Sequence, residues 1–119
     1  MIQFVANAKG ADKLQIDFLI EALQIGSFIA QPTGTYSSGM LKKLSIVLAF
    51  LGAPELIILD EPLTTVDTSA VKNIFELILN YKKLYKTNFL ISSHQLFEQT
   101  DLTITHQYLV QDQTIKLLV

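Results

Sequence analysis

The sequence lacks two residue types on which many functional sites depend. None of its 119 residues is a cysteine, which excludes disulfide bonds and thiolate metal sites and is typical of a cytosolic protein. All nine basic residues are lysines, so the chain supplies no arginine finger and no bidentate guanidinium clamp for a phosphate. The net charge of −2 argues against an electrostatic nucleic-acid binder, and we expect no nucleic acid among the partners.

The sequence also lacks an apolar run long enough to cross a membrane. Its longest such stretch, residues 44–53, is about half of the ~20 residues that a spanning helix needs. It does not open on the charged and then apolar residues of a signal peptide. A composition of 50% hydrophobic and 17% charged residues is that of one globular domain rather than a disordered chain. We therefore expect any membrane contact to be made through a partner.

The stretch from Leu56 to Asp67, LIILDEPLTTVD, is the most informative part of the chain. Its apolar start, bounded by Pro54 and Pro62, predicts a strand that is buried on both faces, as in parallel sheets. The strand ends in two adjacent carboxylates, Asp60 and Glu61, at the edge where open parallel sheets bind ligands. Nucleotide hydrolysis needs a carboxylate to hold Mg²⁺ and often a second group that orients or deprotonates the attacking water. The alternative is an acidic surface turn without a function.

A serine- and glycine-containing segment, Tyr36 to Met40 (YSSGM), lies upstream of these carboxylates. Ser37 or Ser38 can cap a largely buried helix over residues 40–51. The exposed amides at such a helix start favour an anion, and Gly39 lets a phosphate approach the backbone closely. The alternative is a capped helix with no further role.

The phosphate-binding loop of nucleotide hydrolases is absent from the chain. Gly34 and Gly39 have the spacing of its glycines, but Met40 and Leu41 follow where that loop requires Lys and then Ser or Thr. Without the backbone cradle and its lysine, we expect ATP binding by this chain alone to be weak or undetectable. Strands that belong to a larger parallel sheet would also leave unpaired edges here.

Further helices are predicted on both sides of the central stretch. Residues 1–31 read as helical, with a break at Gly10 and a new helix that Asp12 caps and Gly26 ends. The apolar face of that helix is expected to consist of Leu14, Phe18, Leu19, Ala22 and Leu23. Asp67 can cap another helix over residues 68–85.

The last third of the chain is expected to contribute strands. Residues 89–92 predict a second buried strand with His94 at its carboxyl end. Residues 102–119 predict a β-rich end with a turn at 111–113. His106 lies in no motif, and we expect no function for it.

Four segments, in this order and at this spacing, resemble the nucleotide-binding domain of ABC ATPases. YSSGM resembles the signature motif, IILDEP resembles Walker B with its catalytic glutamate, TTVD resembles the D-loop, and Ser93-His94 resembles the switch-histidine loop. The resemblance covers most of the chain and implies an α/β fold, the carboxy-terminal part of a P-loop NTPase. Residues 1–35 would then be part of the helical subdomain, and residues 36–119 would hold the signature helix, the later motifs and the end of the ATPase core.

The resemblance implies roles for individual residues. Glu61 and His94 would be catalytic, and Asp60 would bind Mg²⁺. The residues that contact ATP would be Tyr36, Ser37, Ser38, Gly39, Met40 and Asp67, with Ser37 and Gly39 acting on ATP held by the opposite subunit. Asp67 can also cap its helix, because the two roles are compatible.

The resemblance also implies partners and a location. They are a second ABC ATPase subunit, a transmembrane permease subunit that brings the chain to the inner face of the cell membrane, and an amino-terminal half that carries Walker A. YSxGM is more typical of exporter-type ATPases, so we expect an incomplete ATP-hydrolysing component of an ABC exporter, either truncated or split. Two alternatives stay open, a catalytically silent ABC-like binding module and a fragment of a non-transport ABC ATPase.

Overall fold

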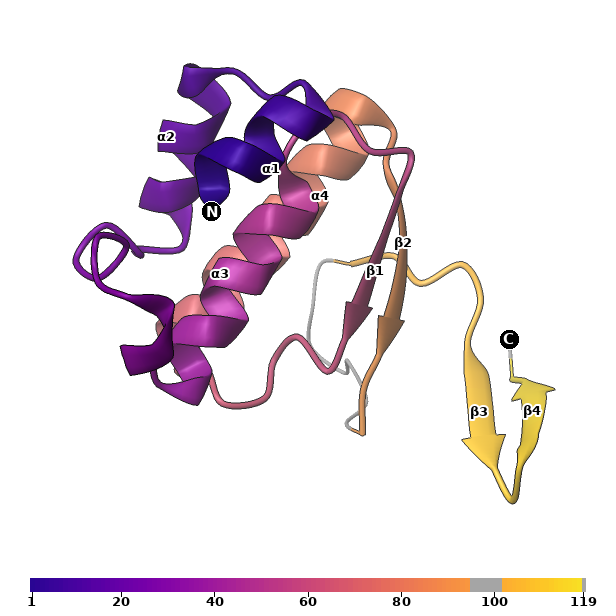
Figure 1. Cartoon of the computed structure of the whole chain (residues 1–119). Helices are drawn as coiled ribbons and strands as arrows, with labels where there is room; N and C mark the ends of the chain where they lie inside the picture. The colour runs from indigo at the N-terminus through magenta and orange to yellow at the C-terminus, as the bar shows by residue number, and fades with distance from the viewer. Residues whose placement is uncertain (95–101, 119) are drawn as a thin grey trace.

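The computed structural model of the chain describes residues 1–94 and 102–118 (Figure 1). Its elements, in chain order, are α1 (Ile2–Lys9), α2 (Lys13–Ala22), the 3₁₀ turn η1 (Thr33–Thr35), α3 (Ser38–Phe50), β1 (Leu56–Asp60), α4 (Thr68–Tyr85), β2 (Asn88–Ser92), β3 (Tyr108–Gln111) and β4 (Thr114–Leu117). No helix within the described ranges is long and apolar enough to span a membrane.

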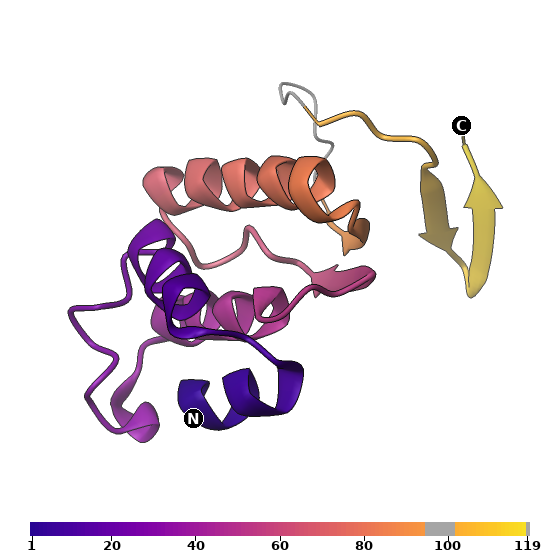
Figure 2. The same cartoon turned by 90° about the horizontal axis from the view of Figure 1, so that it is seen from above.

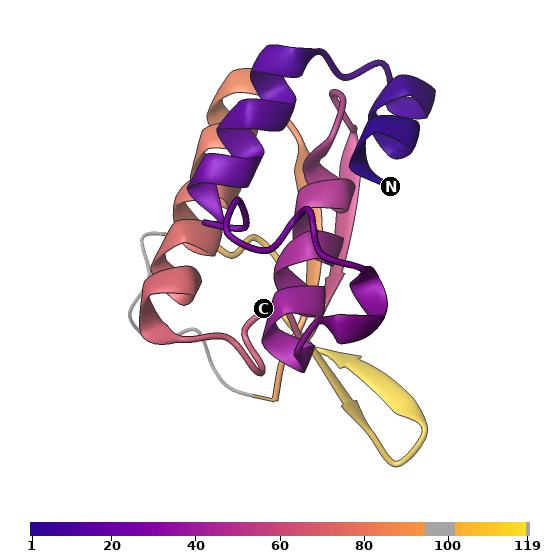
Figure 3. The same cartoon turned by 60° about the vertical axis from the view of Figure 1, so that its left-hand side comes forward.

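The central unit is a parallel pair of strands joined by a helix. β1 and β2 pair in register from Leu56 opposite Asn88 to Asp60 opposite Ser92, and α4 forms the connection between them. Helices α3 and α4 lie on one side of this pair (Figures 1 and 2), and α1 and α2 pack against α3 (Figure 3). Strand–helix–strand order with parallel pairing confirms the predicted α/β class.

The prediction that the first strand is buried on both faces is wrong. Ile57 and Leu59 are only 3% and 5% exposed and belong to the hydrophobic core, whereas Leu56 and Ile58 are 54% and 64% exposed. The neighbouring strand exposes Leu90 to 56% in the same way. Successive side chains of a strand point to opposite faces, and within the described residues the helices cover only one of these faces.

Side chains cap the three longest helices as expected. The carboxylate of Asp12 accepts a hydrogen bond from the Gln15 amide, and the carboxylate of Asp67 accepts one from the Ala70 amide. At the start of α3 the cap is Ser37, whose hydroxyl accepts from the Met40 amide at 3.1 Å. Each cap satisfies one of the amides that have no partner inside the helix.

The predicted end of the second helix at Gly26 is wrong. α2 stops at Ala22, and Gln24 takes the left-handed conformation (φ 55°) in place of a glycine. The predicted apolar face is wrong in part as well. Leu19 and Leu23 are buried as expected, but Leu14 is 80% exposed and Phe18 is 48% exposed. The side chains that reach the core are Ile16, Leu19 and Leu23, because α2 is rotated relative to the predicted face.

A polar network inside the helical part joins three segments. The side-chain amide of Gln15 donates to the Gly52 carbonyl at 2.6 Å and to the Tyr81 hydroxyl at 2.8 Å. Its oxygen accepts from the Gly52 amide at 2.8 Å, and the Tyr81 hydroxyl donates to the Phe50 carbonyl at 2.7 Å. These bonds connect α2 and α4 to the carboxyl end of α3. Burial raises the pKa of the Tyr81 hydroxyl to about 12.

The carboxy-terminal strands form a separate hairpin. β3 and β4 pair antiparallel across a two-residue turn, Asp112-Gln113, whose φ angles are 51° and 59°. Two successive left-handed residues are typical of the tight hairpin turn that matches the twist of the strands. The hairpin stands away from the helices (Figure 1), and the β-rich end with its turn at 111–113 is thereby confirmed.

The hydrophobic core draws on residues from both sides of the predicted boundary at residue 35. Ala6 and Leu19 precede it, and Val47, Ile74 and Tyr81 follow it, yet all five belong to one cluster. The division into residues 1–35 and 36–119 stays a prediction.

Candidate functional site

The carboxyl end of β1 carries two adjacent acids that a serine of β2 ties together. The Ser92 hydroxyl donates to the Asp60 carboxylate and accepts a hydrogen bond from the Glu61 amide at 3.1 Å. The same amide also points to the Ser92 carbonyl at 3.2 Å. Parallel register places Asp60 directly opposite Ser92, so the serine holds the point where the chain leaves the strand. Sequence reasoning missed Ser92, although its position just before Ser93-His94 is a signal that could have found it.

The backbone of Glu61 turns sharply as it leaves the strand. Its φ angle of 48° is in the left-handed region, which costs a residue with a side chain about 1–2 kcal/mol. Two side chains hold this turn through three hydrogen bonds. The Lys42 ammonium donates to the carbonyls of Asp60 (3.4 Å) and Glu61 (3.0 Å), and the Thr64 hydroxyl donates to the Glu61 carbonyl (3.0 Å). A lysine on α3 thus fixes the loop that presents the glutamate.

The structure brings the two predicted catalytic residues together. His94 Nε2 lies 3.2 Å from Glu61 Oε1, with the histidine side chain 92% exposed and the glutamate side chain 24% exposed. A carboxylate beside an imidazole at a strand end can bind a water molecule and accept its proton. The geometry is compatible with the catalytic roles, which stay predictions.

The start of α3 contacts the loop that follows the two acids. A Cβ atom built on Gly39 would lie 2.6 Å from the Thr65 carbonyl oxygen, closer than any side chain tolerates. Thr65 is itself left-handed, with φ 65°. Glycine at position 39 is therefore required by packing between the YSSGM segment and the loop, whatever ligand the segment binds.

The other predicted nucleotide-binding residues have contacts of their own. The Tyr36 hydroxyl donates to the Ile29 carbonyl at 3.2 Å, and its ring packs edge-on against Phe28 with centroids 5.0 Å apart. The sulfur of Met40 accepts from the Ser37 amide at 3.4 Å, and Asp67 caps α4. Ser38 begins α3 as an exposed residue. Within the described ranges no hydrogen bond or ion pair joins YSSGM to Asp60, Glu61 or His94.

The donor set near Asp60 suits a metal ion that arrives with a nucleotide. No group of three or more His, Asp or Glu residues in the described part of the chain could hold a metal by itself. Mg²⁺ commonly binds to only one or two carboxylates and completes its shell with phosphate oxygens and water. Asp60, exposed at the strand end, fits that pattern. The described residues do not offer enough ligands for a metal site built from protein side chains alone.

A shallow cleft of about 230 Å³ runs between α3 and β1 beside these residues. Lys42 and Ala49 line it from the helix, and Ile58, Asp60 and Pro62 line it from the strand and the loop. The cleft thus lies beside Asp60, and the Lys42 side chain that holds the Glu61 backbone lies in its wall.

Comparisons with known proteins agree with the motifs. The family model described as ABC transporter matches residues 2–64. The chain is 36% identical over 87 residues to the uncharacterized ABC transporter ATP-binding protein YcbN of Bacillus subtilis, covering 73% of this chain and 28% of that protein. It is 38% identical over 86 residues to the teichoic acids export ATP-binding protein TagH of Enterococcus faecalis, covering 71% of this chain and 19% of that protein.

Solved structures are similar as well. The ATP-binding subunit of an ABC transporter superposes with a TM-score of 0.69 and 27% identity, over 78% of this chain and 40% of that one. An ATP-binding cassette of an ABC transporter in its ADP conformation gives a TM-score of 0.51 and 28% identity, over 70% of this chain and 32% of that one.

The chain spans only a minor part of each of these proteins, from 19% of TagH to 40% of the ATP-binding subunit. The match nevertheless extends over most of the chain, and the family model alone covers more than half of it. The chain therefore belongs to the ABC transporter family and forms part of its ATP-binding domain, an α/β P-loop NTPase fold.

Proposed function

We propose that this chain is the carboxy-terminal part of the ATP-hydrolysing domain of an ABC exporter. The observation that carries the proposal is the contact of 3.2 Å between His94 and Glu61, next to Asp60 at the carboxyl end of a parallel strand. The exporter assignment is supported by the YSxGM form of the signature segment and by the similarity to TagH, whose name describes export of teichoic acids.

Each residue has a distinct task in this proposal. Asp60 binds the Mg²⁺ ion of Mg-ATP, and that ion neutralises charge on the phosphates. Glu61 accepts a proton from the attacking water, and His94 orients that water and the carboxylate. Ser92 and Lys42 hold Asp60 and the Glu61 backbone in place through the hydrogen bonds described above.

The signature segment acts on a nucleotide held by a second ATPase subunit. The amino-terminal amides of α3 and the hydroxyl of Ser37 or Ser38 are suited to a phosphate, because the dipole of the helix favours an anion there. Tyr36, Gly39 and Met40 shape this segment, and Asp67 lies on the same loop as Thr65, which Gly39 contacts.

An amino-terminal segment with Walker A completes the domain. The chain contains no phosphate-binding loop, and the outer face of its β1–β2 sheet exposes Leu56, Ile58 and Leu90. Further strands and helices of the same domain would cover this face and supply the phosphate cradle. A transmembrane permease subunit is the third partner and places the ATPase on the inner face of the membrane.

The test is reconstitution of ATP hydrolysis. The chain is expressed alone and together with the Walker A segment of a related ABC ATPase, and phosphate release is measured with Mg-ATP. We expect no release by the chain alone and measurable release after complementation. Glu61→Gln should lower the complemented rate by about 10²–10⁴-fold, the usual contribution of a general base.

The matched control is Glu55→Gln, the same chemical change on an exposed residue just before β1. It should leave the complemented rate unchanged. A complemented protein that binds ATP but hydrolyses none would overturn the proposal in favour of a catalytically silent ABC-like binding module. Hydrolysis by the chain alone would overturn the need for a Walker A partner.

A further inference from the structure

The end of the molecule at the amino ends of β1 and β2 is formed by three segments that are far apart in the sequence (top of Figure 1). They are residues 9–15 where α1 ends and α2 begins, the loop 51–55 before β1, and residues 81–87 at the end of α4. The side-chain amide of Gln15 donates to the Gly52 carbonyl and to the Tyr81 hydroxyl. The Thr87 hydroxyl donates to the Pro54 carbonyl at 2.9 Å. These contacts join the segments into one continuous surface, which we call the lysine surface, at the opposite end of the strands from the two acids.

The lysine surface is basic although the chain as a whole is acidic. Five of the nine lysines belong to it, namely Lys9, Lys13, Lys82, Lys83 and Lys86. Its acidic residues are Asp12 and Glu55, whereas the rest of the chain has four lysines and nine acidic residues. Among the described residues no ion pair neutralises these lysines, and Lys13, Lys83 and Lys86 are exposed. This end of the molecule is therefore suited to an anionic partner.

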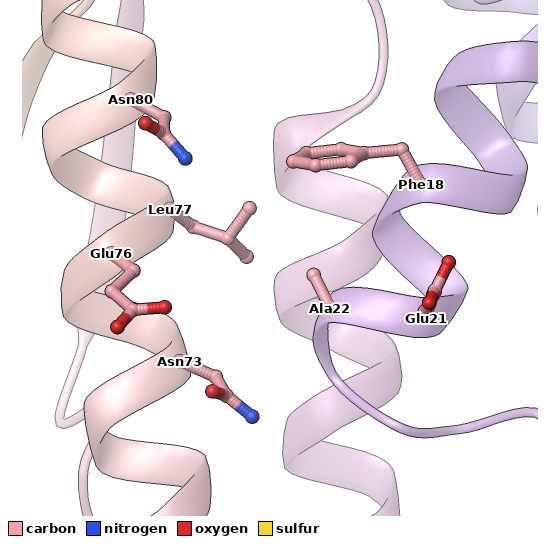
Figure 4. Close-up of a pocket in the computed structure, with 7 residues that line it drawn as sticks. All are labelled: Phe18, Glu21, Ala22, Asn73, Glu76, Leu77 and Asn80. Atoms are coloured by element: carbon pink, nitrogen blue, oxygen red, sulfur yellow. The ribbon is translucent and has the colours of Figure 1, made fainter.

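The carboxylates of the same two helices lie progressively farther from the lysine surface. Asp17 follows Lys13 by about one turn of α2. Farther along, Glu21 lies about 12 Å along the axis of α2 from Lys13. On α4, Glu76 lies about 10 Å along the axis from Lys83. Both glutamates line a separate groove between the helices (Figure 4), beyond the Debye length of about 8 Å at physiological salt, so their effect on the lysines is screened.

Large apolar side chains are exposed between the lysines. Leu84 is 70% exposed and Leu14 is 80% exposed. Tyr85 is 45% exposed, and its ring packs against that of the buried Tyr81 with centroids 4.9 Å apart. The lysines at the end of α4 also complement the helix dipole, but that role requires no exposed leucine or tyrosine. Lysines beside leucine and tyrosine suit the boundary between water and an apolar medium, whereas the phosphates of a nucleic acid would use the charges alone.

We propose that the lysine surface binds directly to an anionic lipid membrane. The ammonium groups of Lys13, Lys83 and Lys86 contact the negatively charged headgroups, and Leu84 and Tyr85 enter the headgroup layer. A lysine close to such a membrane raises the affinity by about fivefold. The contact is additional to the one made through a permease, and it does not depend on ATP hydrolysis because it uses none of the residues assigned to that reaction.

The test is sedimentation of the full 119-residue chain with lipid vesicles. The vesicles consist of phosphatidylcholine, with or without about 30% phosphatidylglycerol to supply the negative charge. Because the chain has a net charge of −2, attraction to the anionic vesicles requires a local basic surface. We expect binding to them to be at least about tenfold tighter at about 0.1 M salt, and we expect most of this difference to disappear at about 1 M salt, where the Debye length is only about 3 Å.

Variants locate the contact on the molecule. Lys83→Gln combined with Lys86→Gln should weaken binding to the anionic vesicles by about tenfold or more at about 0.1 M salt. Leu84→Ser should weaken it by about threefold or more at both salt concentrations, because it removes an apolar contact. The matched control for charge is Lys72→Gln combined with Lys116→Gln, which makes the same change at exposed positions outside the lysine surface and should alter binding by less than about twofold. Circular dichroism verifies that each variant keeps its helices.

Three results would overturn the proposal. The first is equal binding to neutral and anionic vesicles, and the second is an equal loss in the Lys72 and Lys116 control. The third is an Ile58→Ser variant that weakens binding as much as Leu84→Ser, because the open face of the sheet would then be the part that enters the membrane.

Single-stranded RNA distinguishes a membrane from a nucleic acid as the partner. We expect the RNA to bind more weakly than the anionic vesicles. Tight binding of the RNA that is lost in the Lys83 and Lys86 variant but kept in Leu84→Ser would assign the lysine surface to a nucleic acid, and the membrane would be the wrong partner.

Discussion

The two faces of the β1–β2 sheet differ sharply in how they are covered. On the face toward α3 and α4, Ile57 and Leu59 are buried in a continuous core. On the opposite face, Leu56, Ile58 and Leu90 are each more than half exposed. Successive side chains of the same strands therefore point alternately into a packed interior and onto an open apolar surface.

The polar side chains buried on the helical side also all have hydrogen-bond partners. In the described residues no buried side-chain nitrogen or oxygen lacks a hydrogen-bond partner. Gln15 and Tyr81 donate to the backbone carbonyls of Gly52 and Phe50 at the carboxyl end of α3. The β3–β4 hairpin, in contrast, exposes apolar side chains such as Val110 and Ile115, and an isolated hairpin is marginally stable in water. The difference teaches that the helical side has a continuous core with its buried polar groups paired, whereas the outer face of the strands leaves apolar side chains exposed, which is what the proposed Walker A segment would cover.

The largest expected effect separates the two faces directly. Leu59→Ala removes buried methyl groups next to α3 and α4 and should lower the free energy of unfolding by about 2–5 kcal/mol. Ile58→Ala, one residue away on the open face, should change it by less than ~0.5 kcal/mol. Urea unfolding followed by circular dichroism measures both.

Adding the Walker A segment of a related ABC ATPase gives a second test of the difference between the two faces. Once further strands cover the open face, Ile58→Ala should become as costly as a core substitution. An Ile58→Ala variant that is already strongly destabilising in the chain alone would show that self-association covers this face.

A smaller effect is expected where the signature segment meets the loop after the acids. Gly39→Ala brings a Cβ to within 2.6 Å of the Thr65 carbonyl and should destabilise the chain by about 1–3 kcal/mol. The control is Gly34→Ala, because nothing lies within 4 Å of a Cβ at that position. Thermal unfolding of the two variants distinguishes a packing requirement at Gly39 from a requirement for phosphate contact alone, which would leave stability unchanged.

The polar interior predicts a pH dependence of stability. Burial, opposed by the hydrogen bond from Gln15, raises the pKa of Tyr81 to about 12 from 10.0. The folded state thus retains the tyrosine proton that the unfolded state loses first, so the stabilisation is complete below pH 10 and is lost as the pH rises to about 12. Tyr81→Phe should cost about 1–2 kcal/mol at neutral pH because two hydrogen bonds are lost.

The check is the difference in unfolding free energy between the native chain and Tyr81→Phe as a function of pH. It should be constant up to about pH 10 and should shrink above it, because the phenylalanine variant lacks the titrating group. A difference that stays constant through pH 12 would show that the Tyr81 hydroxyl is not held in its neutral form by the fold.

Sequence patterns predicted those parts of the structure that local chemistry decides. The caps Asp12 and Asp67, the parallel strands and the turn near Asp112 all follow from residue types over short spans. The pairing of Glu61 and His94 was predicted from the resemblance to the ABC family, and their contact agrees with the rule that parallel strands bring their carboxyl ends to one edge.

The errors arose where neighbours far along the chain decide the outcome. The apolar run at Leu56–Leu59 suits a strand buried on both faces, but the cover for one face is not supplied by the described residues. Phe18 has helical spacing with Ala22, which packs against the core, yet the rotation of α2 leaves Phe18 half-exposed. The roles of Lys42 and Ser92 were missed because each depends on a contact across 18 residues or more.

The smallest expected effect lies at the boundary between the two faces, where Ser92 joins the two acids. Ser92→Ala removes the hydroxyl from both the Asp60 carboxylate and the Glu61 amide, but water replaces it because the residue is exposed. The free energy of unfolding should therefore fall by less than ~1 kcal/mol.

Amide hydrogen exchange is the more sensitive measurement, since the Glu61 amide loses one of its two acceptors and should exchange faster. Ser27→Ala, at an exposed position away from the sheet, is the matched control. Unchanged exchange at Glu61 would mean that the Ser92 carbonyl, Lys42 and Thr64 hold the turn without the Ser92 hydroxyl, and would contradict the prediction.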